Sequence, residues 1–198
     1  HSSLSHDGLS SIDSVYHYAQ NLAKLDFICV TDHDYLSVTG NWSVAKNKAN
    51  FYYRPASFVT FVGYEFGWWG DGVGHRTVIY PGSDGTRYSR INTDIDSLFT
   101  KVFRSGGILN ICHPDHPIYY AGKDKRDSRV QRNIELYCSE RSRSEYYGNP
   151  NAFSGQRIFS SVQDWLSLNE QLGFLGSSDD HSGKPGSAGL TGVFCENL

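Results

Sequence analysis

The sequence predicts an α/β fold in which a mostly parallel sheet is open or closed into a barrel. Short apolar or β-branched runs recur along the 198 residues and are typical of buried strands. Segments with helical periodicity separate several of these runs, as in sheets whose strands are joined by crossover helices. Five of the runs lead into a histidine or a carboxylate: Phe27–Thr31, Phe58–Tyr64, 107–112, 133–138 and 173–178.

The first half of the chain is expected to begin with a helix, because Ser10 and Ser11 are good N-caps and an apolar stripe follows them. The expected elements are, in order, a helix from Ile12 to Leu25, a strand at Phe27–Thr31, a surface loop or short helix at 38–57, a strand at Phe58–Tyr64, a glycine-rich loop at 67–74 and a strand at Arg76–Tyr80.

The second half repeats the alternation of helices and strands. Asp94 is a good N-cap for a helix, and Gly106-Gly107 would end it. The expected elements are, in order, a helix from Ile95 to Phe103, a strand at 107–112, a polar stretch to Arg132, a strand at 133–138, a long loop to about Ser160, a helix carrying Val162 to Leu172, a strand at 173–177 and a last strand at Leu190–Cys195.

Composition excludes several classes of partner. The chain has 18 basic and 21 acidic residues, a formal net charge of -3, so it lacks the electrostatic footprint of a duplex-binding or membrane-surface protein. No apolar run approaches the ~18 residues of a membrane span. The four cysteines are expected to be buried free thiols, which weakly favours a cytoplasmic protein. A nucleic-acid partner is therefore disfavoured, and a membrane partner is not expected.

The residues that follow the strands point to a metal-dependent enzyme. In α/β folds the carboxyl ends of strands are where active sites are built. Histidine, aspartate and glutamate gathered there form the ligand set of Zn²⁺, Mn²⁺ or Fe²⁺. We therefore expect divalent metal ions as cofactors.

Six short motifs occur in order along the chain: His1-Ser2-Ser3-Leu4-Ser5-His6-Asp7-Gly8, Thr31-Asp32-His33, Glu65 at a strand end, Gly74-His75-Arg76, His113-Pro114 and Ser178-Asp179-Asp180-His181. Together they resemble the PHP (polymerase and histidinol phosphatase) superfamily over nearly the whole chain. The closer resemblance is to a PHP-like metal-dependent phosphoesterase family of unassigned function.

The resemblance implies a distorted seven-stranded β/α barrel of TIM-like type with two to three divalent ions. The first ion would be held by His1, Glu65 and Asp179. Glu65 would bridge to a second ion, held also by His75 and His113. A third ion would be held by Asp7, His33 and His181. His6 is the alternative to Asp7 as a ligand of the third ion. Asp7 is preferred because the residue before the glycine is the usual ligand in the family.

The chain departs from the family pattern at both ends. The first histidine of His-x-His is absent with most of the first strand, and family members continue past the final strand. We therefore expect residues 1–198 to form a single PHP-like domain that is truncated at both ends.

The expected reaction is hydrolysis of a phosphate mono- or diester of a small molecule or nucleotide, in line, by a metal-bound hydroxide. Glu65 is the expected bridging carboxylate, His116 a possible proton donor to the leaving group, and Asp32 a partner that orients a ligand histidine. The phosphate charge needs cations. The candidates for this role are Arg76, Lys184, Arg141 and Arg143.

Two other functions remain open from the sequence. Metal-dependent hydrolases of the amidohydrolase type also gather histidine and aspartate at barrel strand ends. A non-catalytic PHP-like module that binds metal for structural reasons is the other alternative, and the missing first histidine favours it.

Overall fold

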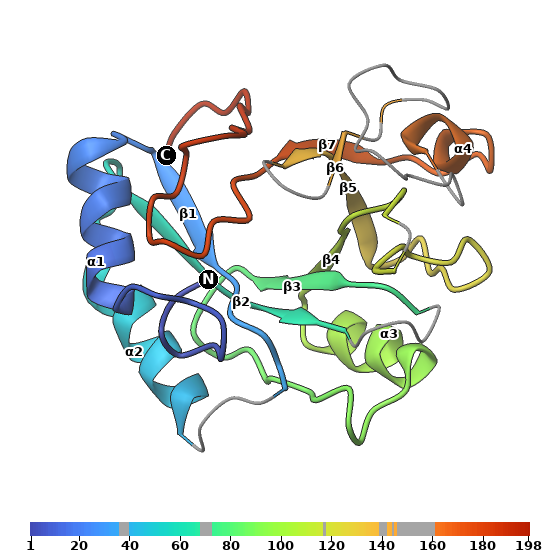
Figure 1. Ribbon diagram of the computed structural model, residues 1–198, viewed down its shortest axis with the longest axis horizontal. Coiled ribbons are helices and arrows are strands. Elements are labelled where there is room, and N and C mark those ends of the chain that lie inside the picture. Colours follow the sequence, from blue (N-terminus) through green and yellow to red (C-terminus); the bar gives the residue numbers. More distant parts are fainter. Residues whose placement is uncertain (36–39, 68–72, 117, 139–141, 144, 146–160) are drawn as a thin grey trace.

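A computed structural model describes residues 1–35, 40–67, 73–116, 118–138, 142–143, 145 and 161–198. The helices are α1 (Ile12–His17), continued by the π-helical turn η1 (Tyr18–Leu22), α2 (Asn41–Tyr52), α3 (Ile95–Arg104) and α4 (Val162–Leu166). The strands are β1 (Phe27–Val30), β2 (Val59–Phe66), β3 (Arg76–Tyr80), β4 (Ile108–Ile111), β5 (Gln131–Cys138), β6 (Ser142–Arg143) and β7 (Gly173–Gly176) (Figure 1).

The seven strands form one mixed sheet in the order β1-β2-β3-β4-β5, and β5 also pairs with β6 and β7. The pairs β1–β2, β4–β5 and β5–β7 are parallel, whereas β2–β3, β3–β4 and β5–β6 are antiparallel. The prediction of a mostly parallel sheet was therefore wrong. Residues 67–75 join β2 to β3, and this connection is shorter than the dozen residues that a parallel crossover needs.

The sheet curls into a half-barrel that is open between β1 and β7, with the helices on its outer side (Figure 1). α1 and α2 cover β1 and β2, α3 covers β4, and α4 covers β5. This confirms the predicted α/β class. The described residues include no helix long and apolar enough to cross a membrane.

Three hydrophobic clusters lie between the helices and the sheet. One joins α1, η1 and α2 to β1 and β2, and contains the fully buried Tyr16 and Phe58. The largest joins α3 to β2, β3 and β4 around Leu98 and Leu109. The third packs Trp165 of α4 against Ile134 of β5. Because the core lies on the convex side, the concave side is available for polar side chains.

Three expected elements differ from the structure. The region 38–57 contains the twelve-residue helix α2. Its apolar stripe is weak in the sequence, because the fully buried residue of this helix is the small Ala49. The first helix ends at Leu22 rather than Leu25, through a π-helical turn. The strand expected at Leu190–Cys195 is absent from these described residues. There the Thr191 hydroxyl bonds to the backbone of Gly176 in place of a strand ladder.

Candidate metal centre

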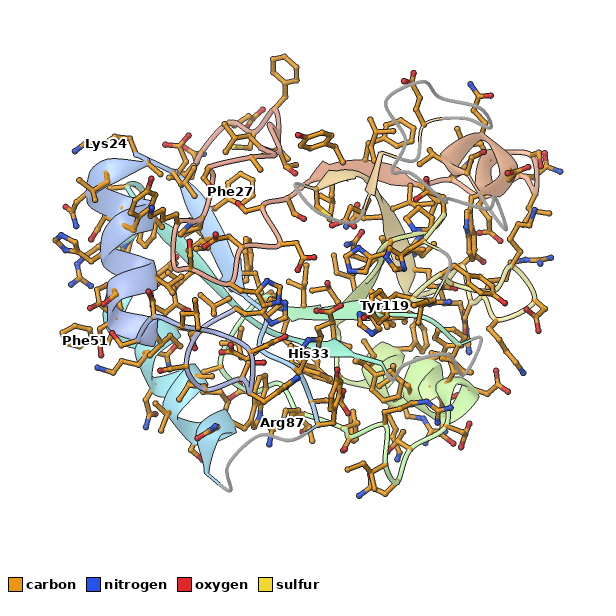
Figure 2. The ribbon with its side chains drawn as sticks, viewed as in Figure 1. Lys24, Phe27, His33, Phe51, Arg87 and Tyr119 are labelled. Atoms are coloured by element: carbon orange, nitrogen blue, oxygen red, sulfur yellow. The ribbon has the colours of Figure 1, made fainter. Side chains whose placement is uncertain are left out.

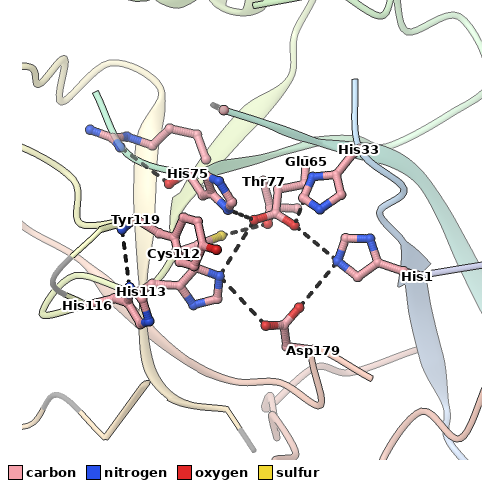
Figure 3. Close-up of polar contacts among 12 residues, drawn as sticks. His1, His33, Glu65, His75, Thr77, Cys112, His113, His116, Tyr119 and Asp179 are labelled. Atoms are coloured by element: carbon pink, nitrogen blue, oxygen red, sulfur yellow. Dashed lines mark hydrogen bonds and ion pairs between the residues drawn. The ribbon is translucent and has the colours of Figure 1, made fainter. Parts of the chain in front are cut away.

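The eight predicted ligand residues converge at one edge of the half-barrel, on its concave side. Figure 3 labels His1, His33, Glu65, His75, His113 and Asp179 among them. They come from the N-terminal loop, from the carboxyl ends of β1, β2, β4 and β7, and from the residue before β3. β3 is antiparallel to its neighbours, so its first residue lies at the edge where theirs end. The eight residues are His1, Asp7, His33, Glu65, His75, His113, Asp179 and His181.

Glu65 lies at the centre of this cluster and is 3% exposed. Its Oε2 is 3.1 Å from His1 Nε2, and its Oε1 is 2.5 Å from His75 Nδ1. Burial raises the pKa of Glu65, but the neighbouring His75 and His33 rings outweigh burial and hold this pKa well below its usual range. The carboxylate is therefore ionised and is shared between two groups of candidate ligands.

The first group comprises His1, Glu65 and Asp179. His1 Nε2 lies 3.3 Å from Asp179 Oδ1, in addition to its contact with Glu65. Burial lowers the pKa of His1, but hydrogen bonds to Asp179 and Glu65 more than compensate and raise it to about 10. The carboxylates of Glu65 and Asp179 therefore favour a positive charge at the position between them.

The second group comprises Glu65, His75 and His113. His113 Nε2 is 3.6 Å from Glu65 Oε1 and 3.7 Å from Asp179 Oδ2. Asp179 therefore lies close to both the first and the second group, and the two groups share Glu65.

The third group comprises Asp7, His33 and His181, with His1 alongside. Asp7 Oδ2 is 3.1 Å from His33 Nε2 and 3.2 Å from His181 Nε2. Burial would raise the pKa of Asp7, but its bonds to His181 and His33 lower this pKa below its usual range. His6 is exposed, and its Nε2 is 4.0 Å from the Asp7 carboxylate. The structure thus places Asp7, rather than His6, among the ring nitrogens.

The donor set fits divalent ions. Bonds of about 2.0–2.1 Å in a tetrahedral site separate the ligand atoms by about 3.3 Å, and the closest contacts within the first and third groups are 3.1 to 3.3 Å. Among the described residues, several buried ring and carboxylate atoms of the cluster make no hydrogen bond of regular geometry, although buried polar atoms normally make one. These atoms are His1 Nδ1, His33 Nδ1, Glu65 Oε1, His75 Nδ1, His75 Nε2 and His181 Nε2.

The N-terminal loop is held in place by buried hydrogen bonds. Asp32 accepts bonds from the backbone nitrogen (2.5 Å) and hydroxyl (2.8 Å) of Ser2. The Ser5 hydroxyl donates to Asp7 Oδ1 at 2.6 Å. A Cβ on Gly8 would meet the Ser2 carbonyl oxygen at 2.0 Å, so the tight approach of these two residues requires glycine. These contacts fix His1 and Asp7 relative to the sheet.

Two of the candidate ligands have left-handed backbone conformations. His113 has φ 46° and Asp179 also has φ 46°, at the ends of β4 and β7. Such conformations cost free energy for residues other than glycine and cluster at functional sites. Here they turn the chain sharply as it leaves a strand, which directs both side chains toward Glu65.

Two residues that were predicted to assist the ligands, Asp32 and Arg76, make other contacts than expected. Asp32 bonds to Ser2 and positions His1 through the backbone, rather than through a histidine ring. Arg76 is fully buried, and its guanidinium donates to the carbonyls of Val73, His75 and Lys125. That guanidinium joins the segments that carry Val73 and Lys125, and these contacts do not support a role in binding phosphate or in catalysis.

The remaining predicted residues lie near the site or outside the described part. His116 Nδ1 accepts bonds from the backbone nitrogens of residues 118 and 119, at 3.2 Å each, and the ring stacks on Tyr119. Lys184 is exposed in the loop after His181. Arg141 and the side chain of Arg143 lie outside the described residues.

The sequence reasoning missed three residues that adjoin the ligands. Glu135 and Cys138 form a further group of possible ligand atoms with His113. The Tyr119 ring lies 4.7 Å from His75 and 6.2 Å from His113, measured between ring centroids. In Figure 2 the labelled Tyr119 lies inside the curl of the sheet, whereas Phe51 points outward. The available signal was a single glutamate inside the apolar run of β5.

A cavity of about 940 Å³ occupies the concave side next to this cluster. His1, Glu65, His113 and Asp179 are among the residues that line it, and the segment from β7 to the end of the chain lines much of the rest, together with side chains of β1 to β4. The volume is in the range of small-molecule sites.

Comparisons with solved structures confirm the PHP-like fold. A two-domain protein from Bacteroides vulgatus, described as containing a predicted PHP-like metal-dependent phosphoesterase, matches with TM-score 0.59 and 16% identity, over 92% of this chain and 50% of that one. PsfC from Pseudomonas syringae matches with TM-score 0.54 and 16% identity, over 87% of this chain and 68% of that one.

A third match is Endonuclease Q in complex with a 27-mer duplex that carries an abasic lesion at the active site, with TM-score 0.55 and 12% identity, over 92% of this chain and 48% of that one. The chain thus spans about half the length of two of these proteins. A family model described as a protein of unknown function (DUF3604) matches residues 19–98. Among curated protein sequences, none matches the chain.

Proposed function

We propose that this protein is a metal-dependent phosphoesterase that hydrolyses a phosphate mono- or diester of a small molecule or nucleotide. The proposal treats residues 1–198 as one PHP-like domain, in line with the single sheet and its three packed clusters. Two to three divalent ions, Zn²⁺ or Mn²⁺ with Fe²⁺ as a further possibility, would act as cofactors.

The observation that carries the proposal is the shared position of Glu65. Its two carboxylate oxygens face different groups of ring nitrogens, with His1 on one side and His75 on the other. A buried, ionised carboxylate that faces two groups of imidazole rings is suited to bridging two cations. Clustered ions of this kind lower the pKa of bound water and neutralise the charge of a phosphoryl group.

The chain's own residues would then have separate roles. His1 and Asp179 with Glu65, and His75 and His113 with Glu65, would hold two ions. Asp7, His33 and His181 would hold the third, and the buried Ser2–Asp32 contact would keep His1 in place. Lys184 is the described cation that we retain for binding the phosphate.

The basic stretch between β4 and β5 argues against a nucleic-acid groove. Lys123, Lys125, Arg126 and Arg129 each have a carboxylate within 4.0 Å, from Asp164, Asp96, Glu170 and Asp127 respectively. Since these charges are paired within the chain, the stretch offers little net positive charge to a polyanion.

The test combines metal analysis with hydrolysis of a generic ester. We would measure bound metals by elemental mass spectrometry, and hydrolysis of 4-nitrophenyl phosphate and of bis(4-nitrophenyl) phosphate with Zn²⁺ or Mn²⁺ added. The variants are Glu65→Gln and His33→Ala. Their controls are Glu196→Gln and His17→Ala, which make the same changes at exposed positions. We expect each site variant to lower activity at least about 100-fold and each control to leave it unchanged.

The outcomes separate the alternatives. Activity that a chelator abolishes and that follows the site variants supports the phosphoesterase. Two to three bound ions without hydrolysis of either ester would favour another metal-dependent hydrolase or a non-catalytic module. Full activity in Glu65→Gln would remove the bridging role on which the proposal depends.

A further inference from the structure

We propose that Glu135 is a positioning residue that holds His113 with its Nε2 turned toward the metal centre. The proposal rests on the proposed function, because His113 matters here as a metal ligand. Glu135 is 2% exposed and lies in the middle of β5, at a position where an unpartnered acid would be costly to bury.

The contacts between the two residues are specific. Glu135 Oε2 is 3.0 Å from His113 Nδ1 and also accepts the backbone N–H of His113 at 3.0 Å. Glu135 Oε1 accepts the hydroxyl of Ser177 at 2.6 Å. One carboxylate therefore holds both the backbone and the ring of His113. The carboxylate is itself held by Ser177, the residue that follows β7.

A β-bulge directly after Glu135 brings a second side chain, that of Cys138, to His113. The pairing of β5 with β7 shifts register between Glu135 and Tyr137, so Leu136 is an extra residue. In a regular strand, residues three apart point to opposite faces. The bulge cancels that alternation, so that Glu135 and Cys138 both reach His113, with Cys138 Sγ 3.9 Å from Nδ1. Bulges of this kind occur next to active sites, where they redirect side chains.

The consequence concerns which ring nitrogen carries the proton. A carboxylate can only accept, so its contact with Nδ1 requires that Nδ1 carry a hydrogen. Nε2, which faces Glu65 and Asp179, is then the atom that can give its lone pair to a metal ion. A carboxylate at the far side of a ligand imidazole also makes the ring a stronger donor.

The other end of the site shows the weaker version of the same arrangement. His181 Nδ1 is 3.0 Å from the carbonyl oxygen of Asp179, and its Nε2 faces Asp7. His113 thus differs from His181 in having a charged acceptor. We therefore expect the affinity for the ion held by His113 to depend strongly on the Glu135 carboxylate.

The first experiment detects the proton directly. Long-range ¹H–¹⁵N spectra of the histidine rings would be recorded for the metal-free and Zn²⁺-loaded protein, with His113→Gln used for assignment. We expect the His113 Nδ1 to carry a hydrogen-bonded, slowly exchanging proton in both states. In Glu135→Gln this resonance should move and exchange faster. A His113 ring with its proton on Nε2 alone would overturn the proposal.

The second experiment measures Zn²⁺ affinity by competition with a chromophoric chelator. Glu135→Gln should weaken binding of one ion about 10- to 100-fold, and Glu135→Asp should restore part of the loss. Glu196→Gln, the same change at an exposed position, should leave the affinity unchanged. Equal affinity in Glu135→Gln and the wild type would contradict the proposal.

Two further outcomes are informative. A Co²⁺-loaded protein that shows thiolate-to-metal absorption, lost in Cys138→Ser, would mean that metal binds between His113, Glu135 and Cys138, and would overturn the positioning role. If the wild type binds no metal, the proposed function fails, yet the metal-free spectrum still decides whether Glu135 holds the Nδ1 proton. The same wild-type spectrum decides the matter if Glu135→Gln does not fold.

Discussion

At the scale of single residues, the candidate centre is built from acids whose environments differ sharply. Glu65 and Asp7 lie among histidine rings, which lower the pKa of both carboxyls. Asp34 lies one residue from His33 but faces the other way, and its carboxylate accepts bonds from the backbone nitrogens of Gly67 and Arg90. Glu65 and Asp7 therefore contribute to the candidate centre, whereas Asp34 holds the backbone of nearby loops.

Asp34 gives a prediction about pH. Burial raises its pKa to about 6, although the bonds from Arg90 and Gly67 partly oppose this. Because the unfolded chain has a pKa of about 3.9 here, the folded state binds the extra proton between pH 4 and 6. The contribution of Asp34 to the free energy of unfolding should therefore fall by about 3 kcal/mol as the pH rises through that window.

The measurement is urea unfolding of the metal-free protein from pH 4 to pH 7. The difference between the wild type and Asp34→Asn should show this slope, whereas the exposed Asp84→Asn should show none. Parallel curves for the wild type and Asp34→Asn would mean that Asp34 titrates normally.

At the scale of elements, each helix packs on the convex side of the sheet and leaves the strand ends for the site. The antiparallel β3 carries His75 before its first residue, and the bulged β5 carries Glu135 in its middle. Both residues lie beside His113, His75 because β3 runs antiparallel to β4 and Glu135 because β5 pairs with β4.

Helix α3 gives a prediction about capping. Asp94 accepts the backbone N–H of Ser97 at 2.9 Å and its hydroxyl at 2.7 Å. Asp94→Ala should lower the free energy of unfolding by about 1 kcal/mol, because the first turn loses its cap. Asp96→Ala in the same helix removes an exposed ion pair with Lys125 and should cost less than about 0.5 kcal/mol. Chemical denaturation measures both, and equal losses would argue against a specific capping effect.

At the scale of the whole molecule, the candidate centre joins the two ends of the chain. The backbone nitrogen of His1 donates to the carbonyl of Asp180 at 2.9 Å, and Leu9 donates to the carbonyl of His181 at 2.8 Å. The N-terminal loop and the segment after β7 thus meet at the site, although the half-barrel is open between β1 and β7.

Metal removal should therefore lower the stability of the whole fold. An ion that binds only the folded state adds about 2.7 kcal/mol when its free concentration is 100 times its Kd. We expect a chelator to lower the melting temperature of the wild type, and to do so much less in His33→Ala. Calorimetry with and without Zn²⁺ measures this, and a melting temperature independent of metal would contradict it.

The α/β class and the main strands could be predicted from the amino-acid sequence, because buried apolar runs and helix caps are local signals. β2, β3 and α3 lie within a residue or two of their expected bounds. The ligand motifs were also recognisable in the sequence, most of them after strands, and the structure brings all eight predicted ligands together. Their role as ligands stays a prediction.

The direction of the strands, the bulge in β5 and the surroundings of the auxiliary residues depend on contacts between distant segments. Arg76 reads as a free cation in the sequence, yet its guanidinium is buried against three carbonyls that lie on two separate segments. Glu135 reads as an ordinary strand residue, yet the pairing of β5 with β4 places it beside His113, which follows β4. Contacts of this kind depend on how distant segments pair, and local patterns do not encode that pairing.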